Sequence, residues 1–79
     1  MTNLEKYNQV FVECLEITES ALNADLIYNS VEQWDSIGHM AMIAELEDTF
    51  DIMIDTEDVI DFSSYEKGKD ILAKYDVEL

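Results

Sequence analysis

Residues 35–50 have the sequence DSIGHMAMIAELEDTF, and this segment decides the fold of the 79-residue chain. It opens with Asp35, a residue type favoured at the N-cap of a helix, and it contains no proline. We therefore expect a helix from Ser36 to about Asp51. Its apolar residues fall on two arcs of the helical wheel, and the wider arc is suited to face a core. That arc contains Met42, Ile43, Leu46 and Phe50, with His39 beside it.

The second arc of this helix is also apolar, although a helix that only supports a core is polar on its outer face. An exposed apolar strip bordered by acids is typical of a transient protein-binding surface. The alternative is that the strip packs against another part of the chain. We favour the binding surface because acids border the strip and because it begins beside Ser36. The strip consists of Ile37, Met40, Ala41 and Ala44, and its acidic neighbours are Glu47, Asp48 and Asp51.

The chain before this segment predicts one helix and one long loop. Thr2 and Glu5 form a capping-box pattern, which indicates a helix from residue 3 to about residue 17. Residues 18–35 lose the helical period, yet Tyr28 and Trp34 lie among their turn-forming residues and indicate a loop packed on the core. A loop of this length in so small a domain usually has a function. Here that function would be to deliver Ser36.

The chain after the central helix predicts an extended segment and two more helices. Residues 51–55 lack a helical pattern, and Thr56 is expected to cap a short acidic helix. Ser63 and Glu66 form a second capping-box pattern, so a last helix is expected from there to about Tyr75.

Gly68 lies on the expected core face of the last helix. A glycine there costs about 1 kcal/mol relative to alanine, so we expect another element to approach it closely. The sequence thus predicts a single all-α domain spanning residues 1–79. It would have three longer helices, one short third helix and a long loop between the first two.

Composition limits the possible partners. The net charge is −15, with nineteen acidic residues against four lysines and no arginine. Nucleic acids and anionic membrane surfaces require positive charge, so both are excluded as expected partners. Basic protein patches are the natural complement of such a surface. The charged N-terminal region resembles neither a signal peptide nor a membrane span, so we expect a cytoplasmic protein, and a monomer.

Catalysis and metal binding find little support in the sequence. The chain is too short to wall off a pocket easily, and Ser36 lacks the flanking glycines of a nucleophile elbow. His39, three residues on, would turn towards the core. Residues 51–55 lack the alternating oxygen ligands of a calcium loop, and one cysteine, Cys14, allows neither a disulfide nor a cysteine metal site. We expect no enzyme activity, no catalytic residues and no metal.

Covalent modification suits Ser36 better. A serine in the first turn of a helix is accessible to a modifying enzyme. A phosphodiester formed there would lie at the positive end of the helix dipole, near free backbone N–H groups. Gly38 would keep that turn uncluttered. The alternative is that Ser36 only begins the helix, since Asp-Ser is common at helix starts.

The segment Asp35-Ser36-Ile37 resembles the Asp-Ser-Leu signature of acyl carrier proteins. The spacing from Ser36 to Leu46-Glu47, and the short acidic helix expected at 56–61, are also similar to that family. The resemblance implies a stand-alone carrier with an acyl-carrier-like four-helix bundle. A phosphopantetheinyl transferase would attach 4′-phosphopantetheine from coenzyme A to Ser36, which Asp35 and Ile37 flank. The arm would carry acyl thioesters for fatty-acid, polyketide-like or specialised acyl biosynthesis.

The resemblance also implies surfaces for partners and cargo. The second helix would dock on basic patches of acyl-loading and acyl-using enzymes through Asp35, Ile37, Met40, Ala44, Glu47 and Asp48. An acyl chain could fold back between the second and third helices. Its hypothesised lining is Ile43, Leu46, Ile54, Val59, Ile60 and Phe62, although the same side chains could simply form the core.

Other functions than that of a fatty-acid carrier are also compatible with the sequence. Gly38 and Ala41 stand where fatty-acid carriers commonly have acids, and Asp55 stands where a proline is common. An aminoacyl or peptidyl carrier, or a carrier for another specialised acyl group, is therefore an alternative. A protein of a different class, a non-covalent acidic adaptor for a basic partner, would use the same helix without modification of Ser36.

Overall fold

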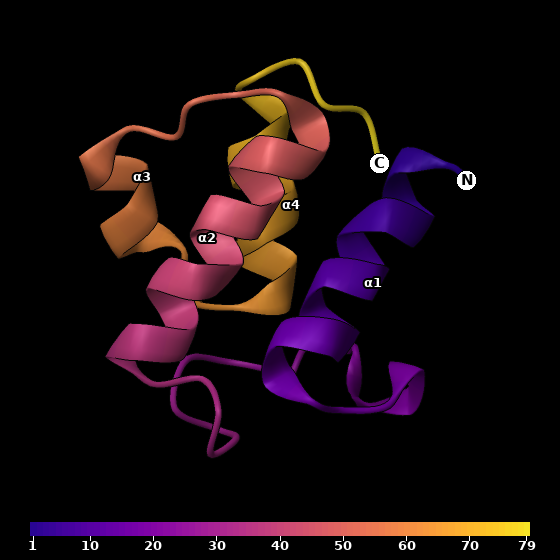
Figure 1. Cartoon of the computed structure of the whole chain (residues 1–79), viewed down its shortest axis with the longest axis vertical. Coiled ribbons are helices and arrows are strands. Elements are labelled where there is room, and N and C mark those ends of the chain that lie inside the picture. The colour runs from indigo at the N-terminus through magenta and orange to yellow at the C-terminus, as the bar shows by residue number, and fades with distance from the viewer.

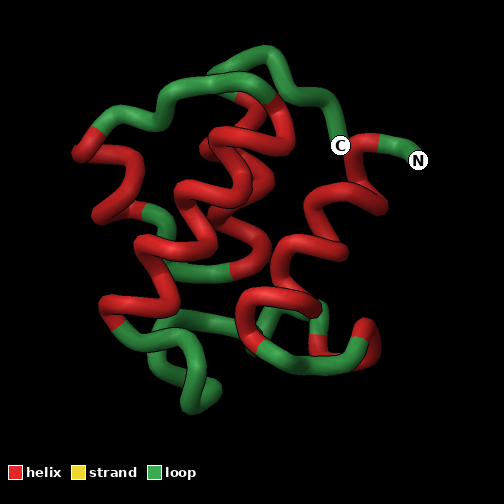
Figure 2. Tube along the Cα trace, viewed as in Figure 1, coloured by secondary structure: helices red, strands yellow, loops and turns green.

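Four α-helices and one short 3-10 turn make up the computed structural model, which describes all 79 residues. The only β-type pairing is an isolated bridge between Ile27 and Ser64, so the predicted all-α class is confirmed. Figure 1 shows α2 between α1 and α3, with α4 behind it, and Figure 2 shows the loops that connect them. The elements are α1 (Asn3–Leu15), η1 (Glu19–Ala21), α2 (Ser36–Phe50), α3 (Thr56–Asp61) and α4 (Tyr65–Ala73).

The two longest helices begin at the caps that the sequence predicts. At α1 the Glu5 N–H donates to Thr2 Oγ1 at 3.1 Å, and the Thr2 N–H donates to the Glu5 carboxylate at 3.2 Å. At α2 the Gly38 N–H donates to Asp35 Oδ1 at 2.8 Å. Helix α1 ends two residues earlier than predicted, because Glu16 adopts a left-handed conformation with φ 54°. Asp51 ends α2 in the same way.

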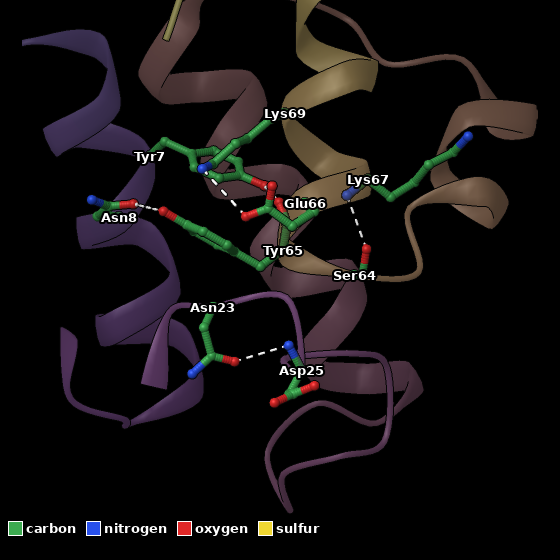
Figure 3. Close-up of polar contacts among 9 residues, drawn as sticks. All are labelled: Tyr7, Asn8, Asn23, Asp25, Ser64, Tyr65, Glu66, Lys67 and Lys69. Carbon is green, nitrogen blue, oxygen red and sulfur yellow. Dashed lines mark hydrogen bonds and ion pairs between the residues drawn. The ribbon is translucent and has the colours of Figure 1, made fainter. Parts of the chain in front are cut away.

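The predicted caps of the last two helices are wrong by one residue. Thr56 is the first helical residue of α3, and its N-cap is Asp55, which makes no side-chain capping bond. Ser64, not Ser63, caps α4 and accepts the Lys67 N–H at 2.9 Å (Figure 3). The backbone of Ser63 is engaged elsewhere, because its carbonyl accepts the Tyr28 N–H at 2.8 Å.

The core is centred on Phe11, whose side chain is fully buried. Trp34 packs edge-on against it with ring centroids 5.6 Å apart, and Tyr65 does so at 5.2 Å. The predicted packing role of Trp34 is therefore confirmed. Gly68 faces the Tyr7 hydroxyl and the Phe62 ring, and a Cβ atom at residue 68 would overlap both. The close approach predicted for this glycine is thus also confirmed.

Polar contacts join α1 to α4 beside this core. The Tyr7 hydroxyl donates to the Tyr65 carbonyl at 2.7 Å, and the Tyr65 hydroxyl donates to Asn8 Oδ1 at 2.5 Å (Figure 3). Burial raises the pKa of the Tyr7 phenol, which keeps it protonated as a donor. The chain ends also meet, because the Asn3 amide donates to the Glu78 carbonyl at 3.0 Å (Figure 1).

The loop between α1 and α2 is held against the rest of the molecule, as predicted. Leu26 is buried, and its carbonyl accepts the Tyr65 N–H at 2.9 Å. A turn before it is closed by the Asp25 N–H, which donates to Asn23 Oδ1 at 2.9 Å (Figure 3). The loop is thus attached to the start of α4 before it reaches α2, which fixes the position of Ser36.

No helix combines the length and the apolar character needed to cross a bilayer.

Candidate functional site

Ser36 is the first residue of α2, and its side chain is exposed. Asp35 accepts the Gly38 N–H with its side chain and the His39 N–H with its carbonyl. The N–H groups of Ser36 and Ile37 make no hydrogen bond within the chain. The first turn of α2 therefore presents a free hydroxyl beside two free backbone donors, as expected at a helix N-terminus.

Gly38 allows the loop to lie directly against this turn. A Cβ atom at residue 38 would collide with the carbonyl of Gln33. The sequence predicts only that a glycine leaves the turn uncluttered. The structure adds a steric reason, which is the close return of the loop backbone just before α2.

Both ring nitrogens of His39 have hydrogen-bond partners other than Ser36. The Trp34 Nε1–H lies 2.9 Å from His39 Nδ1, and His39 Nε2 lies 2.8 Å from the Val59 carbonyl oxygen. Because an indole N–H only donates, Nδ1 must accept, and the proton resides on Nε2 and is donated to Val59. Both ring nitrogens are therefore occupied, and no hydrogen bond joins His39 to the Ser36 hydroxyl. The residue connects the loop, α2 and α3.

An open groove of about 320 Å³ lies beside Ser36. Its walls come from the loop, the start of α2, the short helix α3 and the segment that leads into α4. Most of its lining is apolar, and Ser36 is itself part of that lining. The lining residues are Tyr28, Ser36, His39, Met40, Val59, Ile60, Phe62 and Ser63.

The hypothesised acyl lining is divided between this groove and the core. Val59, Ile60 and Phe62 line the groove, and Ile60 is 74 % exposed. The other three hypothesised residues are buried in the core and do not line it: Ile43, Leu46 and Ile54. Sequence reasoning missed Tyr28 and Ser63 as groove residues, because helical periodicity says nothing about which loop side chains reach a helix.

The apolar strip on α2 is exposed. Ile37 is 80 % exposed and Met40 57 %, and Ala41 and Ala44 are also exposed. The alternative that this strip packs against the rest of the chain is therefore excluded, although Met40 also contributes to the groove. Asp48 is exposed beside the strip.

Glu47, another expected docking residue, has a structural contact. Its side chain is half-buried, and Oε2 accepts the Ile54 N–H at 2.9 Å. This bond holds the extended segment between α2 and α3 against α2. Glu47 can offer its remaining oxygen to a partner, but Asp35 and Asp48 are the more exposed acids of this face.

A polar cluster fixes α3 to the end of α4. Asp58 is buried, and its two carboxylate oxygens each lie 2.5 Å from a partner, Lys74 Nζ and the Tyr75 hydroxyl. These hydrogen bonds lower the pKa of Asp58 and raise the pKa values of Lys74 and Tyr75. The Tyr75 hydroxyl also accepts the Asp55 N–H at 2.9 Å. The groove wall formed by α3 is thus held by His39 on one side and by this cluster on another.

Metal binding and a reactive thiol are the other kinds of site considered for this chain. No group of three or more histidine, cysteine, aspartate or glutamate side chains is arranged to hold a metal ion. Cys14 is half-buried, and this burial raises the pKa of its thiol. The negative charges of Glu45 and Glu13 raise the pKa further, by a smaller amount. A raised pKa leaves little reactive thiolate at neutral pH.

Comparison of the chain with family models, curated proteins and solved structures found no significant match. Its functional interpretation therefore depends on the residues around Ser36 and on their geometry. The resemblance of residues 35–37 to the acyl carrier signature stays a prediction from the sequence.

Proposed function

We propose that this chain is a stand-alone acyl carrier protein that bears 4′-phosphopantetheine on Ser36 and delivers acyl thioesters to partner enzymes. The observation that carries the proposal is the position of Ser36, which is exposed on the first turn of α2 and forms one wall of an apolar groove. The helix order supports the corresponding bundle, with a short third helix and a long loop between the first two helices.

The first turn of α2 suits a phosphodiester. The free N–H groups of Ser36 and Ile37 can donate to its oxygens, and the helix dipole favours a negative charge there by about 0.3–1 kcal/mol. The side chain of Asp35 accepts the Gly38 N–H, and this capping bond does not involve the Ser36 hydroxyl. Attachment of a phosphodiester to that hydroxyl therefore leaves the cap in place. A phosphate group on Ser36 therefore fits the residues present.

Attachment requires only a hydroxyl from this chain. Ser36 Oγ would form a bond to the phosphorus that carries pantetheine in coenzyme A, and the pyrophosphate P–O bond would break. Adenosine 3′,5′-bisphosphate leaves with the electron pair, and the serine proton passes to a base of the Mg²⁺-dependent transferase. When bound, the group supplies a thiol that holds acyl groups as thioesters. Both ring nitrogens of His39 are already hydrogen-bonded, to Trp34 and Val59, which supports a carrier that does not itself transfer protons.

Partner enzymes would dock on the exposed strip of α2. Ile37 and Met40 supply apolar area next to the attachment site, and Asp35 and Asp48 supply negative charge around it. Between Asp35 and Asp61 there are nine acids and no lysine or arginine, so basic patches fit this face. The partners are the transferase and enzymes that load or use the acyl group, in fatty-acid, polyketide-like, specialised acyl or aminoacyl biosynthesis.

A second candidate function is a non-covalent acidic adaptor. The specific observation in its favour is the 80 % exposure of Ile37, which gives the strip a binding surface that needs no modification of Ser36. An adaptor would bind a basic partner equally well with alanine at residue 36, whereas a carrier with that change would lose its function while keeping its fold.

The proposal is tested by incubation with coenzyme A, Mg²⁺ and broad-specificity phosphopantetheinyl transferases, followed by intact-mass measurement. We expect a mass gain of one phosphopantetheine. Ser36→Ala should abolish the gain, and Ser20→Ala, a matched change at another exposed serine, should not. Failure of several transferases to modify the folded protein would favour the adaptor.

A further inference from the structure

We propose that His39 makes the attachment of α3 to α2 depend on pH: the neutral ring holds the two helices together, and protonation of the ring releases α3. His39 is a buried titratable side chain for which the proposed function has no chemical use. It is the only histidine of the chain, so a single group acts as the sensor. The inference does not depend on modification of Ser36.

The two hydrogen bonds of His39 require a neutral ring. Its Nδ1 accepts the indole N–H of Trp34 at 2.9 Å, and its Nε2 donates to the Val59 carbonyl at 2.8 Å. A protonated imidazole carries a hydrogen on both nitrogens and can only donate. The indole N–H would then point at a second N–H, so the bond to Trp34 is lost when the ring becomes charged.

The rings around His39 do not compensate a positive charge. Trp34, Tyr28 and Phe62 surround it, with ring centroids between 5.5 and 6.3 Å away. Of these three only Tyr28 is titratable, and a phenol is ordinarily neutral below about pH 10. His39 itself is 9 % exposed. Because burial of an unpaired charge is costly, the charged ring favours a conformation in which it reaches water.

The acids of the neighbouring elements do not pair with the ring either. Asp35, at the start of α2, caps the helix, and Asp58 of α3 is bound to Lys74 and Tyr75. Neither of the two salt bridges of the chain involves the imidazole. The other acids of the loop and of α3 are exposed: Asp25, Glu32, Glu57 and Asp61.

Loss of the bond to Trp34 also affects the bond to α3. Both hydrogen bonds use one rigid ring, so a rotation that separates Nδ1–H from the indole moves Nε2 away from the Val59 carbonyl. This bond is the direct polar link between α2 and α3. Protonation of one side chain therefore weakens the contacts of α2 with the loop and with α3 together.

The second attachment of α3 does not respond to pH in the same range. Hydrogen bonds with Lys74 and then Tyr75 lower the pKa of Asp58, and the bond to Asp58 raises the pKa values of both partners. These groups therefore keep their protonation states between pH 5 and pH 8, where a histidine ordinarily changes its charge. In acid α3 should separate from α2 while it stays attached to α4.

NMR between pH 8 and pH 5 tests the proposal, because the chain has one histidine and one tryptophan. The ring signals of His39, the indole N–H signal of Trp34 and the methyl signals of Val59 are followed in the same samples. We expect all of them to change in one step at the same pH. The methyl groups of Leu72, which is fully buried in α4, are the internal control and should not change.

The indole N–H gives the size of the effect. Its solvent exchange, corrected for the intrinsic dependence of exchange on pH, should be about fivefold faster at pH 5 than at pH 8. This factor corresponds to the loss of one hydrogen bond worth about 1 kcal/mol.

Two variants identify the responsible group. His39→Gln provides an amide oxygen and an N–H but does not titrate, so the step in the Trp34 and Val59 signals should disappear. Asp61→Asn removes an exposed carboxylate from α3 and keeps the histidine, so the step should remain. An α-amino group also titrates in this range, and both variants retain it.

Three results would overturn the proposal. The first is a His39 ring that stays neutral down to pH 5, and the second is a ring that titrates while the Trp34 and Val59 signals stay unchanged. The third is a simultaneous change of the Leu72 methyl groups, because it would mean that the whole fold loosens. If His39→Gln does not fold, the titration of the wild-type chain still decides. A failure to modify Ser36 would overturn the carrier function and leave this inference standing.

Discussion

The Nε2 atom of His39 lies 2.8 Å from the carbonyl oxygen of Val59, and this bond joins the helix that begins at Ser36 to the short helix α3. The other ring nitrogen accepts the indole N–H of the fully buried Trp34. One side chain thus connects the loop, α2 and α3 directly below the candidate site. Its contribution should be visible in the stability of the fold.

His39→Ala should destabilise the fold by about 2–4 kcal/mol, because it leaves a buried indole N–H and a carbonyl unpaired and creates a small cavity. Urea unfolding would measure the change. Met40→Ala, one residue on at an exposed position, is the control and should cost far less. A loss similar to that of the control would show that the two hydrogen bonds contribute little.

Asp58 should give the stability a dependence on acid pH. Hydrogen bonds from Lys74 and then Tyr75 lower its pKa in the folded state, so its contribution is present above the ordinary carboxyl pKa of about 3.9. That contribution is lost as the pH falls through the lower, folded-state pKa. Asp58→Asn should therefore be less stable than wild type at pH 7, and the difference should shrink in acid. Unfolding free energies measured across this range provide the test.

Asp61→Asn is the matched control for this experiment, because it removes the same charge from an exposed position of the same helix. If loss of a negative charge only relieved repulsion, both variants would be stabilised alike. If the hydrogen bonds of Asp58 stabilise the fold, only Asp58→Asn should be destabilised. At alkaline pH the raised pKa values of Lys74 and Tyr75 predict the opposite slope. Their contributions are complete below the ordinary pKa values of about 10 and are lost as the pH rises through the folded-state values.

Gly68→Ala should destabilise the protein although alanine is the better helix former. The gain in helix propensity is about 1 kcal/mol at an exposed position. At residue 68 the new methyl would overlap the Tyr7 hydroxyl and the Phe62 ring, and overpacking a core costs about 1–3 kcal/mol before that gain is subtracted. Thermal unfolding would show the sign. A rise in melting temperature would mean that the two rings move aside at little cost.

Divalent cations should raise the melting temperature at low ionic strength. The net charge of −15 places many exposed acids near one another, and their repulsion opposes the compact state. For a domain of this size a stabilisation of 1 kcal/mol corresponds to roughly 4–8 °C. Titration with Mg²⁺ or Ca²⁺, compared with NaCl at equal ionic strength, would measure the effect. An unchanged melting temperature would contradict this view of the repulsion.

The sequence predicts α2 and its cap because both depend on local signals. Asp35 needs only the N–H of Gly38, three residues away, and the core arc follows from the helical period. The start of α4 could not be placed as well, because the choice between Ser63 and Ser64 depends on the pairing of Ser63 with the distant loop at Tyr28. Local spacing favoured the wrong serine there.

The exposed hydroxyl of Ser36 could likewise be predicted, but its surroundings could not. The bond from His39 to Val59 spans twenty residues, and the cluster of Asp58 with Tyr75 spans seventeen. Such contacts depend on how the helices pack. The same holds for the groove, where the loop residue Tyr28 meets α3. Ile43 and Leu46 were assigned to the acyl lining by helical face, yet both lie in the core, since a wheel does not show how far a side chain is from the surface.

Attachment of a phosphopantetheine arm to Ser36 can be tested by fragment mass spectrometry of the protein after reaction with coenzyme A and a transferase. We expect one added phosphopantetheine, located on the fragment that contains Ser36 and absent from Ser36→Ala. A folded, unmodified protein after treatment with several transferases would contradict it, as would a modification at any other serine.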